Sequence, residues 1–185
     1  MAEPEIRARS ALEGMMLPER LGLALVREAP EACRFSCRGA AEPLGTAVGV
    51  TMPGQPSRVE TQNGRAALWL GPDEWLVLAP ARDRSQLAEG LRKAAAGGTC
   101  MAVDVSHRHV GLVITGRRAG TLLASGCPLD LDTSAFPVGM CTRTLLNKAD
   151  IVLWRTAPDA FHIEVWRSFA PYVVGLLDEA MRDLD

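Results

Sequence analysis

Short apolar runs separated by turn residues dominate the chain from residue 46 onward. The runs at 46–52, 66–70 and 75–79 are divided by Gly, Pro and Asn-Gly, which predicts three strands of about five residues. Leu87, Leu91 and Ala94 then recur at helical spacing, and Gly97-Gly98 provides a typical stop. We therefore expect one helix over 82–96.

The second half of the chain alternates in the same way. Its apolar patterns predict strands at 101–105, 109–115, 140–146, 151–155 and 161–166, and helices at 117–125 and 169–184. In the last helix the predicted apolar side carries Tyr172, Leu176, Leu177 and Ala180. Strands outnumber helices, so the expected fold class is α+β.

A weak internal repeat crosses this pattern. Leu-Trp, Pro-Asp and an aromatic residue precede the helix at 82–96 and again, about 85 residues later, the helix at 169–184; the two copies are Leu68-Trp69, Pro72-Asp73 and Trp75, and Leu153-Trp154, Pro158-Asp159 and Phe161. Chance is the alternative, because Pro-Asp is a common turn pair. A true repeat predicts two ferredoxin-like split β-α-β halves packed as one domain.

The first 43 residues differ from the rest. They carry several charges and little periodicity, which predicts an extended N-terminal arm over 1–43 with at most a short helical or strand segment near 21–26. The remainder, 44–185, is expected to form a single α+β domain with halves at about 44–105 and 106–185.

Composition narrows the class of protein. The 185 residues are 48% hydrophobic and 23% charged, as in globular proteins, and the net charge of −2 argues against nucleic acid as a partner. No apolar run approaches the ~20 residues that cross a membrane, and the N-terminus has no signal-peptide pattern, so we expect no membrane contact and a cytoplasmic location. The five cysteines are irregularly spaced, which is typical of reduced, buried thiols; they are Cys33, Cys37, Cys100, Cys127 and Cys141.

Ser106, His107 and His109 follow a predicted strand that ends near Asp104, which places a hydroxyl close to imidazoles. Neighbouring strand residues point to opposite faces, and the Gly-x-Ser-x-Gly elbow is absent. Hydrolase chemistry is therefore disfavoured, and Asp104 and Ser106 are expected to satisfy backbone groups at a turn.

Other chemical motifs are weak. Cys33 and Cys37 could bind Zn²⁺ together with His107 and His109, but a lone Cys-x₃-Cys is poor metal spacing. Neither common phosphate-binding Gly loop occurs, so we expect no nucleotide cofactor on this chain.

Asp130 and Asp132 could form a carboxylate pair, although loop carboxylates that bond local amides are the favoured interpretation. Large amphipathic side chains also gather near the C-terminus, and Trp and Arg are common interface anchors; the set is Arg143, Trp154, Arg155, Trp166, Arg167, Phe169 and Tyr172.

Several motifs together resemble the gamma subunit family of heterotetrameric sarcosine oxidases. They are Leu70-Gly71-Pro72-Asp73-Glu74-Trp75-Leu76, Asp104-Val105-Ser106, Gly126-Cys127-Pro128-Leu129-Asp130-Leu131, Phe136-Pro137, Thr144-Leu145-Leu146, Arg167-Ser168-Phe169-Ala170 and, near the start, Ser10-Ala11-Leu12. The resemblance covers nearly the whole chain.

This resemblance implies a subunit of an enzyme that converts sarcosine to glycine, hydrogen peroxide and, with tetrahydrofolate, methylenetetrahydrofolate. The expected partners are alpha, beta and delta subunits, which would hold FAD, FMN, NAD, tetrahydrofolate and zinc, whereas this chain would carry no cofactor and no catalytic residue. Its partner-interface candidates are Arg155, Trp166, Arg167 and Phe169.

The segment 104–146 is also similar to the folate-binding aminomethyltransferase domain of the glycine cleavage system. Asp130 corresponds to the catalytic carboxylate of that family, and Leu129 stands where the family has Asn. The resemblance implies an aminomethyltransferase-like domain. The alternative function is therefore a stand-alone folate-binding enzyme or accessory protein, with Asp130 as its catalytic candidate.

Overall fold

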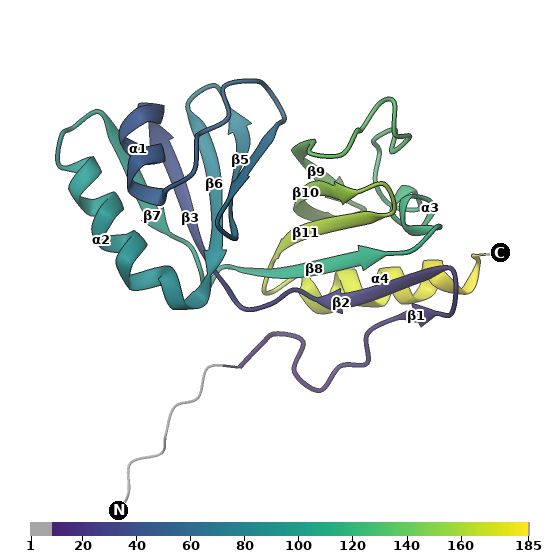
Figure 1. Ribbon diagram of the computed structural model, residues 1–185. Helices are drawn as coiled ribbons and strands as arrows, with labels where there is room; N and C mark the ends of the chain where they lie inside the picture. Colours follow the sequence, from purple (N-terminus) through teal and green to yellow (C-terminus); the bar gives the residue numbers. More distant parts are fainter. Residues whose placement is uncertain (1–8, 185) are drawn as a thin grey trace, which may run out of the picture.

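The computed structural model describes residues 9–184 and contains two antiparallel sheets whose inner faces pack together (Figure 1). Each sheet carries two helices on its outer face. No helix in these residues is both long and apolar enough to cross a membrane.

The N-terminal sheet has five strands in the order β4-β5-β6-β3-β7. Its strands are β3 (Ala32–Gly39), β4 (Val59–Gln62), β5 (Arg65–Gly71), β6 (Glu74–Pro80) and β7 (Cys100–Asp104), and its helices are α1 (Ala41–Val48), the 3₁₀ turn η1 (Ala81–Asp83) and α2 (Arg84–Ala95). Alternation along β3 decides its faces: Cys33, Phe35 and Cys37 pack under the helices, while Arg34 and Ser36 face the other sheet.

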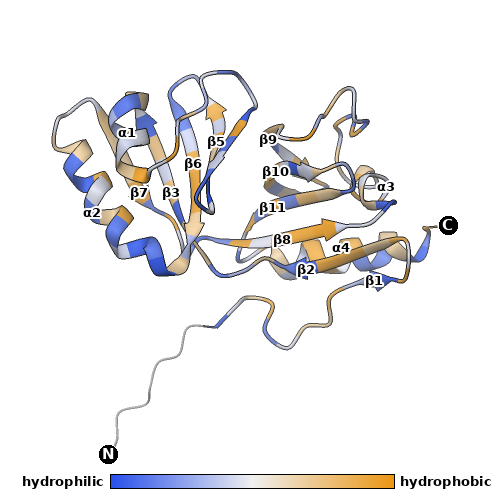
Figure 2. Ribbon diagram, viewed as in Figure 1, coloured by the Kyte–Doolittle hydropathy of each residue, from blue (hydrophilic) through white to orange (hydrophobic). Residues whose placement is uncertain are grey.

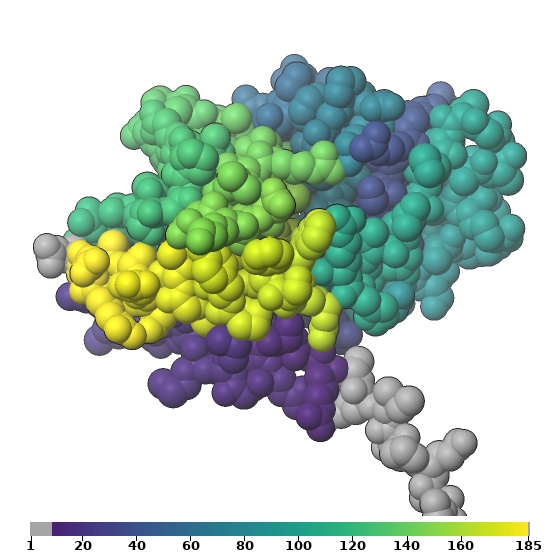
Figure 3. All heavy atoms as spheres, turned by 180° about the vertical axis from the view of Figure 1, so that it is seen from behind, coloured from purple at the N-terminus to yellow at the C-terminus, as the bar shows by residue number. Residues whose placement is uncertain are grey.

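The C-terminal sheet has six strands in the order β1-β2-β8-β11-β10-β9. Its strands are β1 (Glu19–Arg20), β2 (Ala24–Glu28), β8 (His109–Thr115), β9 (Cys141–Leu146), β10 (Ala149–Ala157) and β11 (Ala160–Trp166), and its helices are α3 (Ala119–Ala124) and α4 (Ala170–Arg182). Figure 3 shows the N-terminal segment against α4, where the Arg20 guanidinium donates to the carbonyls of Met181 and Arg182.

The two sheets are built on one plan. The run β3-α1-β4-β5-β6-α2-β7 matches β8-α3-β9-β10-β11-α4, and the corresponding strands take the same places in the two sheets. The second run lacks a final strand, and β2 from the start of the chain fills that place beside β8. The expected α+β class and the ferredoxin-like halves are therefore confirmed.

Two glycines mark this symmetry at atomic detail. Gly39 ends β3 with φ +103°, and a Cβ there would lie 2.4 Å from the Thr99 carbonyl oxygen before β7. Gly116 follows β8 with φ +122°, and its Cβ would lie 2.3 Å from the Leu23 carbonyl oxygen before β2. The backbone amides of Gly39 and Gly116 donate to the backbone carbonyls of Asp73 and Asp159, the two Asp residues of the Pro-Asp repeat.

The expected N-terminal arm is the main correction. Within the described part of this segment, 9–43, the structure has three strands and the start of α1, so the expected boundary at 43/44 falls inside a helix. The apolar residues of β3 alternate with Arg34, Ser36 and Arg38, a strand pattern that the charges obscured. The strand expected at 46–52 is also wrong, because α1 covers its first three residues and no strand follows before β4.

Three apolar clusters hold the fold together. One lies under α1 and α2, a second under α3 and α4, and a third between the sheets. Figure 2 shows that β6 and β8, which are central to their sheets, are largely hydrophobic. The inter-sheet cluster consists of Ala66, Leu68, Leu76, Leu78, Cys141 and Val152.

Candidate functional site

A buried ion pair links the two sheets. Arg34 of β3 and Glu164 of β11 are both buried, with Nε to Oε2 at 2.5 Å and Nη2 to Oε1 at 3.2 Å. His162 Nε2 lies 2.8 Å from Glu164 Oε1, and Arg34 also donates to the Ala32 carbonyl. Gly111 lies opposite Glu164, and its missing Cβ leaves room for both charged groups.

The environment fixes the charge state of this cluster. Burial alone raises the pKa of the Glu164 carboxyl, but hydrogen bonds from His162 and Arg34 outweigh it and hold the pKa below its ordinary value. Neighbouring His109 on β8 has its pKa lowered to about 4, chiefly by burial. The carboxylate is thus ionised and the His109 ring neutral at pH 7.

A second polar link lies farther along the same face. Glu74 of β6 accepts hydrogen bonds from Arg38 of its own sheet and from Arg143 of β9 in the other. The bond from Arg143 is the main reason that the pKa of Glu74 lies below its usual value. In the first link the arginine comes from the N-terminal sheet and the carboxylate from the C-terminal sheet. In the second link the carboxylate comes from the N-terminal sheet and Arg143 from the C-terminal sheet.

Three cavities border these links. The first, about 450 Å³, lies where the chain crosses between the two units, each unit being one sheet with its helices. The second, about 460 Å³, opens between the sheets at Trp166. The third, about 630 Å³, lies beside Trp154. Within residues 9–184, His109 Nδ1 and Trp154 Nε1 are buried without a hydrogen-bond partner. These walls offer apolar area and isolated polar atoms, an arrangement suited to binding.

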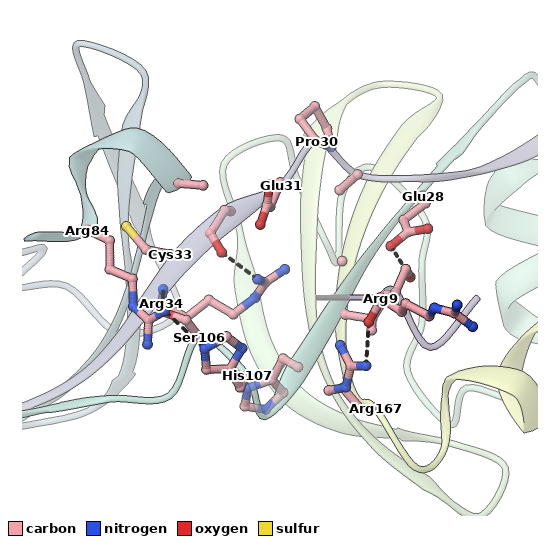
Figure 4. Close-up of a pocket in the computed structure, with 17 residues that line it drawn as sticks. Arg9, Glu28, Pro30, Glu31, Cys33, Arg34, Arg84, Ser106, His107 and Arg167 are labelled. Atoms are coloured by element: carbon pink, nitrogen blue, oxygen red, sulfur yellow. Dashed lines mark hydrogen bonds between the residues drawn. The ribbon is translucent and has the colours of Figure 1, made fainter. Parts of the chain in front are cut away.

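The polar groups of the first cavity mostly bond one another (Figure 4). Arg167 Nη2 donates to the Arg9 carbonyl, and Ser10 Oγ donates to Glu28. Arg84 donates to Asp104 outside the cavity wall and contacts His107 Nε2 at 3.0 Å. The cavity is thus a polar junction between the units.

The serine that follows β7 has a structural partner. Ser106 Oγ donates to Asp104 Oδ1 at 2.6 Å and accepts from the Arg34 amide at 3.0 Å. The Ser106 amide also donates to Asp104 Oδ1. The interpretation of Asp104 and Ser106 as turn residues that satisfy backbone groups is therefore confirmed.

The cysteine and histidine candidates do not converge. Cys33, His107 and His109 all line the first cavity, but both Cys33 and Cys37 pack in the apolar cluster under the helices, and Cys37 does not reach the cavity. No cluster of three or more metal-binding side chains occurs in the part of the chain that the structure describes. All five cysteines are buried and free, and burial raises the pKa of Cys37 to about 12.

Asp130 lies in an exposed loop after α3. Its Oδ1 accepts from the Asp132 amide at 2.9 Å, and Asp132 Oδ1 in turn accepts from the Ser134 amide and hydroxyl. The hydrogen bonds from Ser134 lower the pKa of Asp132. Asp130 lines none of the three cavities, so its contacts are those of a turn residue.

The interface candidates separate into two groups. Arg155 is buried, and its guanidinium donates to the carbonyls of Leu131, Phe136 and Pro158, so its assignment to a partner surface is corrected. This role was not visible in the sequence because two of the three accepting carbonyls, those of Leu131 and Phe136, come from a loop before β9.

The other candidates lie at the surface where β11 joins α4. Trp166 and Phe169 are 39% and 38% exposed, and the Arg108 guanidinium lies 4.4 Å from the centre of the Trp166 ring. Arg167 is half-buried, so the expectation that it faces outward more than Trp166 is wrong. Tyr172, expected on the apolar side of the last helix, is also exposed.

Comparisons with known proteins identify relatives along almost the whole chain. The family model described as sarcosine oxidase, gamma subunit family, matches residues 37–183. Sarcosine oxidase subunit gamma of Corynebacterium sp. (strain P-1) and that of an Arthrobacter species are each 32% identical over 182 residues, covering 95% of this chain and 89% of the relative.

Solved structures support the same relationship. A chain of the heterotetrameric sarcosine oxidase from Corynebacterium sp. U-96, in complex with pyrrole 2-carboxylate, superposes with a TM-score of 0.86 at 26% identity, over 95% of both chains. The glycine cleavage system aminomethyltransferase T from Bartonella henselae gives 0.64 at 16% identity, over 86% of this chain and 47% of that one. The second likeness concerns the fold alone.

Proposed function

Because this chain belongs to the sarcosine oxidase gamma subunit family, we propose that it is the gamma subunit of a heterotetrameric sarcosine oxidase and has no reaction of its own. The observation that carries this proposal is the agreement over 95% of both chains with a subunit of a solved heterotetramer.

The contacts of the candidate residues favour a structural rather than a catalytic role for this chain. Ser106 bonds Asp104 instead of an imidazole, and Asp130 bonds a neighbouring amide in an open loop. A general acid or base must reach the proton that it transfers, and neither carboxylate lies in a cavity wall. The proposed contribution of this chain is therefore assembly of the enzyme.

We assign the remaining chemistry to the partners. Alpha, beta and delta subunits would carry FAD, FMN, NAD, tetrahydrofolate and zinc, and would convert sarcosine to glycine, hydrogen peroxide and methylenetetrahydrofolate. The exposed aromatic groups Trp166 and Phe169, with Arg167 between them, form the proposed contact surface, since aromatic residues and Arg are enriched in interfaces.

Co-purification tests the function. A tagged copy expressed in its native host should recover larger subunits in a yellow complex that oxidises sarcosine, whereas the isolated chain should show no flavin absorbance. A colourless lone chain that binds a reduced folate tightly would contradict the proposal and support the folate-binding alternative.

A further inference from the structure

Strand β7 is an uncovered edge of the N-terminal sheet. It pairs with β3 on one side, and no other strand among residues 9–184 pairs with it. The corresponding strand of the C-terminal sheet is β2, whose outer edge is paired with β1. Because the two units correspond strand by strand, an extended strand is expected beside β7, as β1 lies beside β2. Residues 9–184 do not supply that strand.

The backbone of β7 has hydrogen-bonding groups for such a strand. The Val105 amide donates to the Arg34 carbonyl at one end of the pairing, and the Ala40 amide donates to the Thr99 carbonyl at the other. Residues of an antiparallel strand alternate between bonding inward and outward. The N–H and C=O groups of Ala102, between these ends, therefore point to the free edge, and those of Asp104 do the same.

The side chains along this edge are apolar and exposed. Met101 and Val103 are 54% and 51% exposed, and they lie directly opposite Arg38 and Ser36 on the face turned toward the C-terminal sheet. Ser36 lines the 460 Å³ cavity, so the apolar stripe continues into that cavity. Exposed apolar edge strands favour pairing with another chain, and natural proteins normally protect them.

The charges around the stripe indicate which chain would pair there. Arg143 lines the cavity and shares Glu74 with Arg38, and the side chains of both arginines are about half exposed. Exposed Arg108 also lines the cavity, where it lies against the Trp166 ring. Glu164 is paired with Arg34 and Asp104 with Arg84, so Asp150 and the shared Glu74 are the carboxylates that stand against these three arginines, which leaves an excess of one positive charge in a chain of net charge −2. A second copy of this chain would bring like charges together, whereas an acidic segment would neutralise them.

We infer that β7 receives an extended, acidic segment of a larger partner subunit, which adds a sixth strand to the N-terminal sheet. Its backbone would bond Ala102 and Asp104, its apolar side chains would cover Met101 and Val103, and its carboxylates would face Arg38. The inference rests on the proposed function, because it adds the β7 edge to the proposed contact surface at Trp166 and Phe169.

The test introduces charge at the edge. Val103→Lys and Met101→Lys should each leave the thermal midpoint of the isolated chain within a few degrees, because both side chains are exposed, and should weaken assembly with the other subunits at least 10-fold. Val138→Lys is the matched control, since Val138 is 47% exposed in a distant loop, and should assemble like the wild type. Binding of the wild type should weaken as salt concentration rises.

Amide hydrogen exchange gives a second readout. The amides of Ala102 and Asp104 should exchange rapidly in the isolated chain and slowly in the complex. Normal assembly of both lysine variants, or unchanged exchange at these amides in an assembled complex, would overturn the inference while leaving the subunit role intact. A concentration-dependent dimer of the isolated chain that Val103→Lys abolishes would also overturn it, because the occupant would then be a second copy. Failure of the wild type to assemble at all would instead contradict the proposed function.

Discussion

Glu164 is the residue that joins the two sheets most directly. A buried carboxylate is costly unless its hydrogen-bonding capacity is filled, and here Arg34 and His162 fill it. Arg34 and Glu164 come from strands of different sheets, so the pair forms only when the two sheets pack in this arrangement. Removal of one partner leaves the other uncompensated in the core.

Arg34→Met should therefore destabilise the chain more than most single substitutions. We expect a loss of about 3–5 kcal/mol in the free energy of unfolding, measured by urea denaturation, because Glu164 loses the arginine that donates two hydrogen bonds to it. The double variant Arg34→Met with Glu164→Leu should recover much of this loss. Losses that simply add in the double variant would contradict the coupling between the two residues.

His109 should make stability depend on pH. Its folded pKa of about 4 lies below the ordinary 6.5, so the unfolded chain takes up a proton between these values that the folded chain does not. The groups that face this ring are Glu164, which favours its protonation, and Arg34, Arg108 and Arg143, which oppose it.

Stability should accordingly fall as the pH is lowered from about 6.5 to 5, a window above the titration of the carboxylates. The slope should be smaller than the ~1.4 kcal/mol per pH unit of one fully linked proton, because the ring is partly solvated. His109→Gln should flatten this part of the profile of thermal midpoint against pH, and the same substitution at exposed His107 serves as the control. An unchanged slope in His109→Gln would rule out this origin.

At the scale of elements, the symmetry makes β2 the missing last strand of the C-terminal unit. Gly116 approaches the residue before β2 as Gly39 approaches the residue before β7. In the N-terminal unit the equivalent strand follows its helix directly, whereas β2 reaches the same position from the other end of the chain.

A circular permutant tests this equivalence. It would begin at Glu31, run to Leu184 and return through a flexible linker of about ten residues to the segment 9–30. Such a linker reaches up to ~33 Å, more than the ~20 Å length of α4 that it must span. We expect the permutant to fold with a native circular dichroism spectrum, and deletion of residues 1–30 to abolish cooperative unfolding. A permutant that stays unfolded would show that β2 depends on its native connection to β3.

Much of the element pattern could be predicted from the sequence after residue 60, where apolar alternation and turn residues coincide. The strand β8 agrees with its predicted bounds, and α2 and α4 agree within two residues at each end. The region before residue 53 departs from its predicted structure because the charges of Arg34, Arg38 and Glu42 are typical of a solvated segment. Arg34 is in fact neutralised by Glu164, which lies 130 residues away, and no local pattern reveals that pairing.

At the scale of the whole molecule, the inter-sheet core should make the two units unfold together. Leu68 is fully buried in that core, and Leu68→Ala should cost about 2–5 kcal/mol. We expect tryptophan fluorescence and circular dichroism to report one coincident transition in both the wild type and the variant. Two separate transitions in the wild type would contradict a shared core.

The candidate site was less predictable than the fold, because it depends on contacts between distant segments. Trp166, Arg167 and Phe169 were correctly placed at the junction of a strand and a helix, but only packing decides that Trp166 is the more exposed. Arginine is a residue type common in interfaces, but Arg155 lies in the interior of the protein. The edge of β7 became recognisable only when the strand order was known, since its sequence reads like any short strand.

The place of β2 also orders the events of biosynthesis. Roughly 80 residues separate the end of β2 from the start of β8, its partner, and a ribosome adds about 5–20 residues each second. Strand β2 must therefore wait about 4–16 s for β8, while the segment from β3 to β7 emerges complete and can close its own sheet. The N-terminal unit can then fold first and provide the surface against which the second unit packs. The nascent β2 lacks β8 during this time, so it is the segment that a chaperone would need to bind.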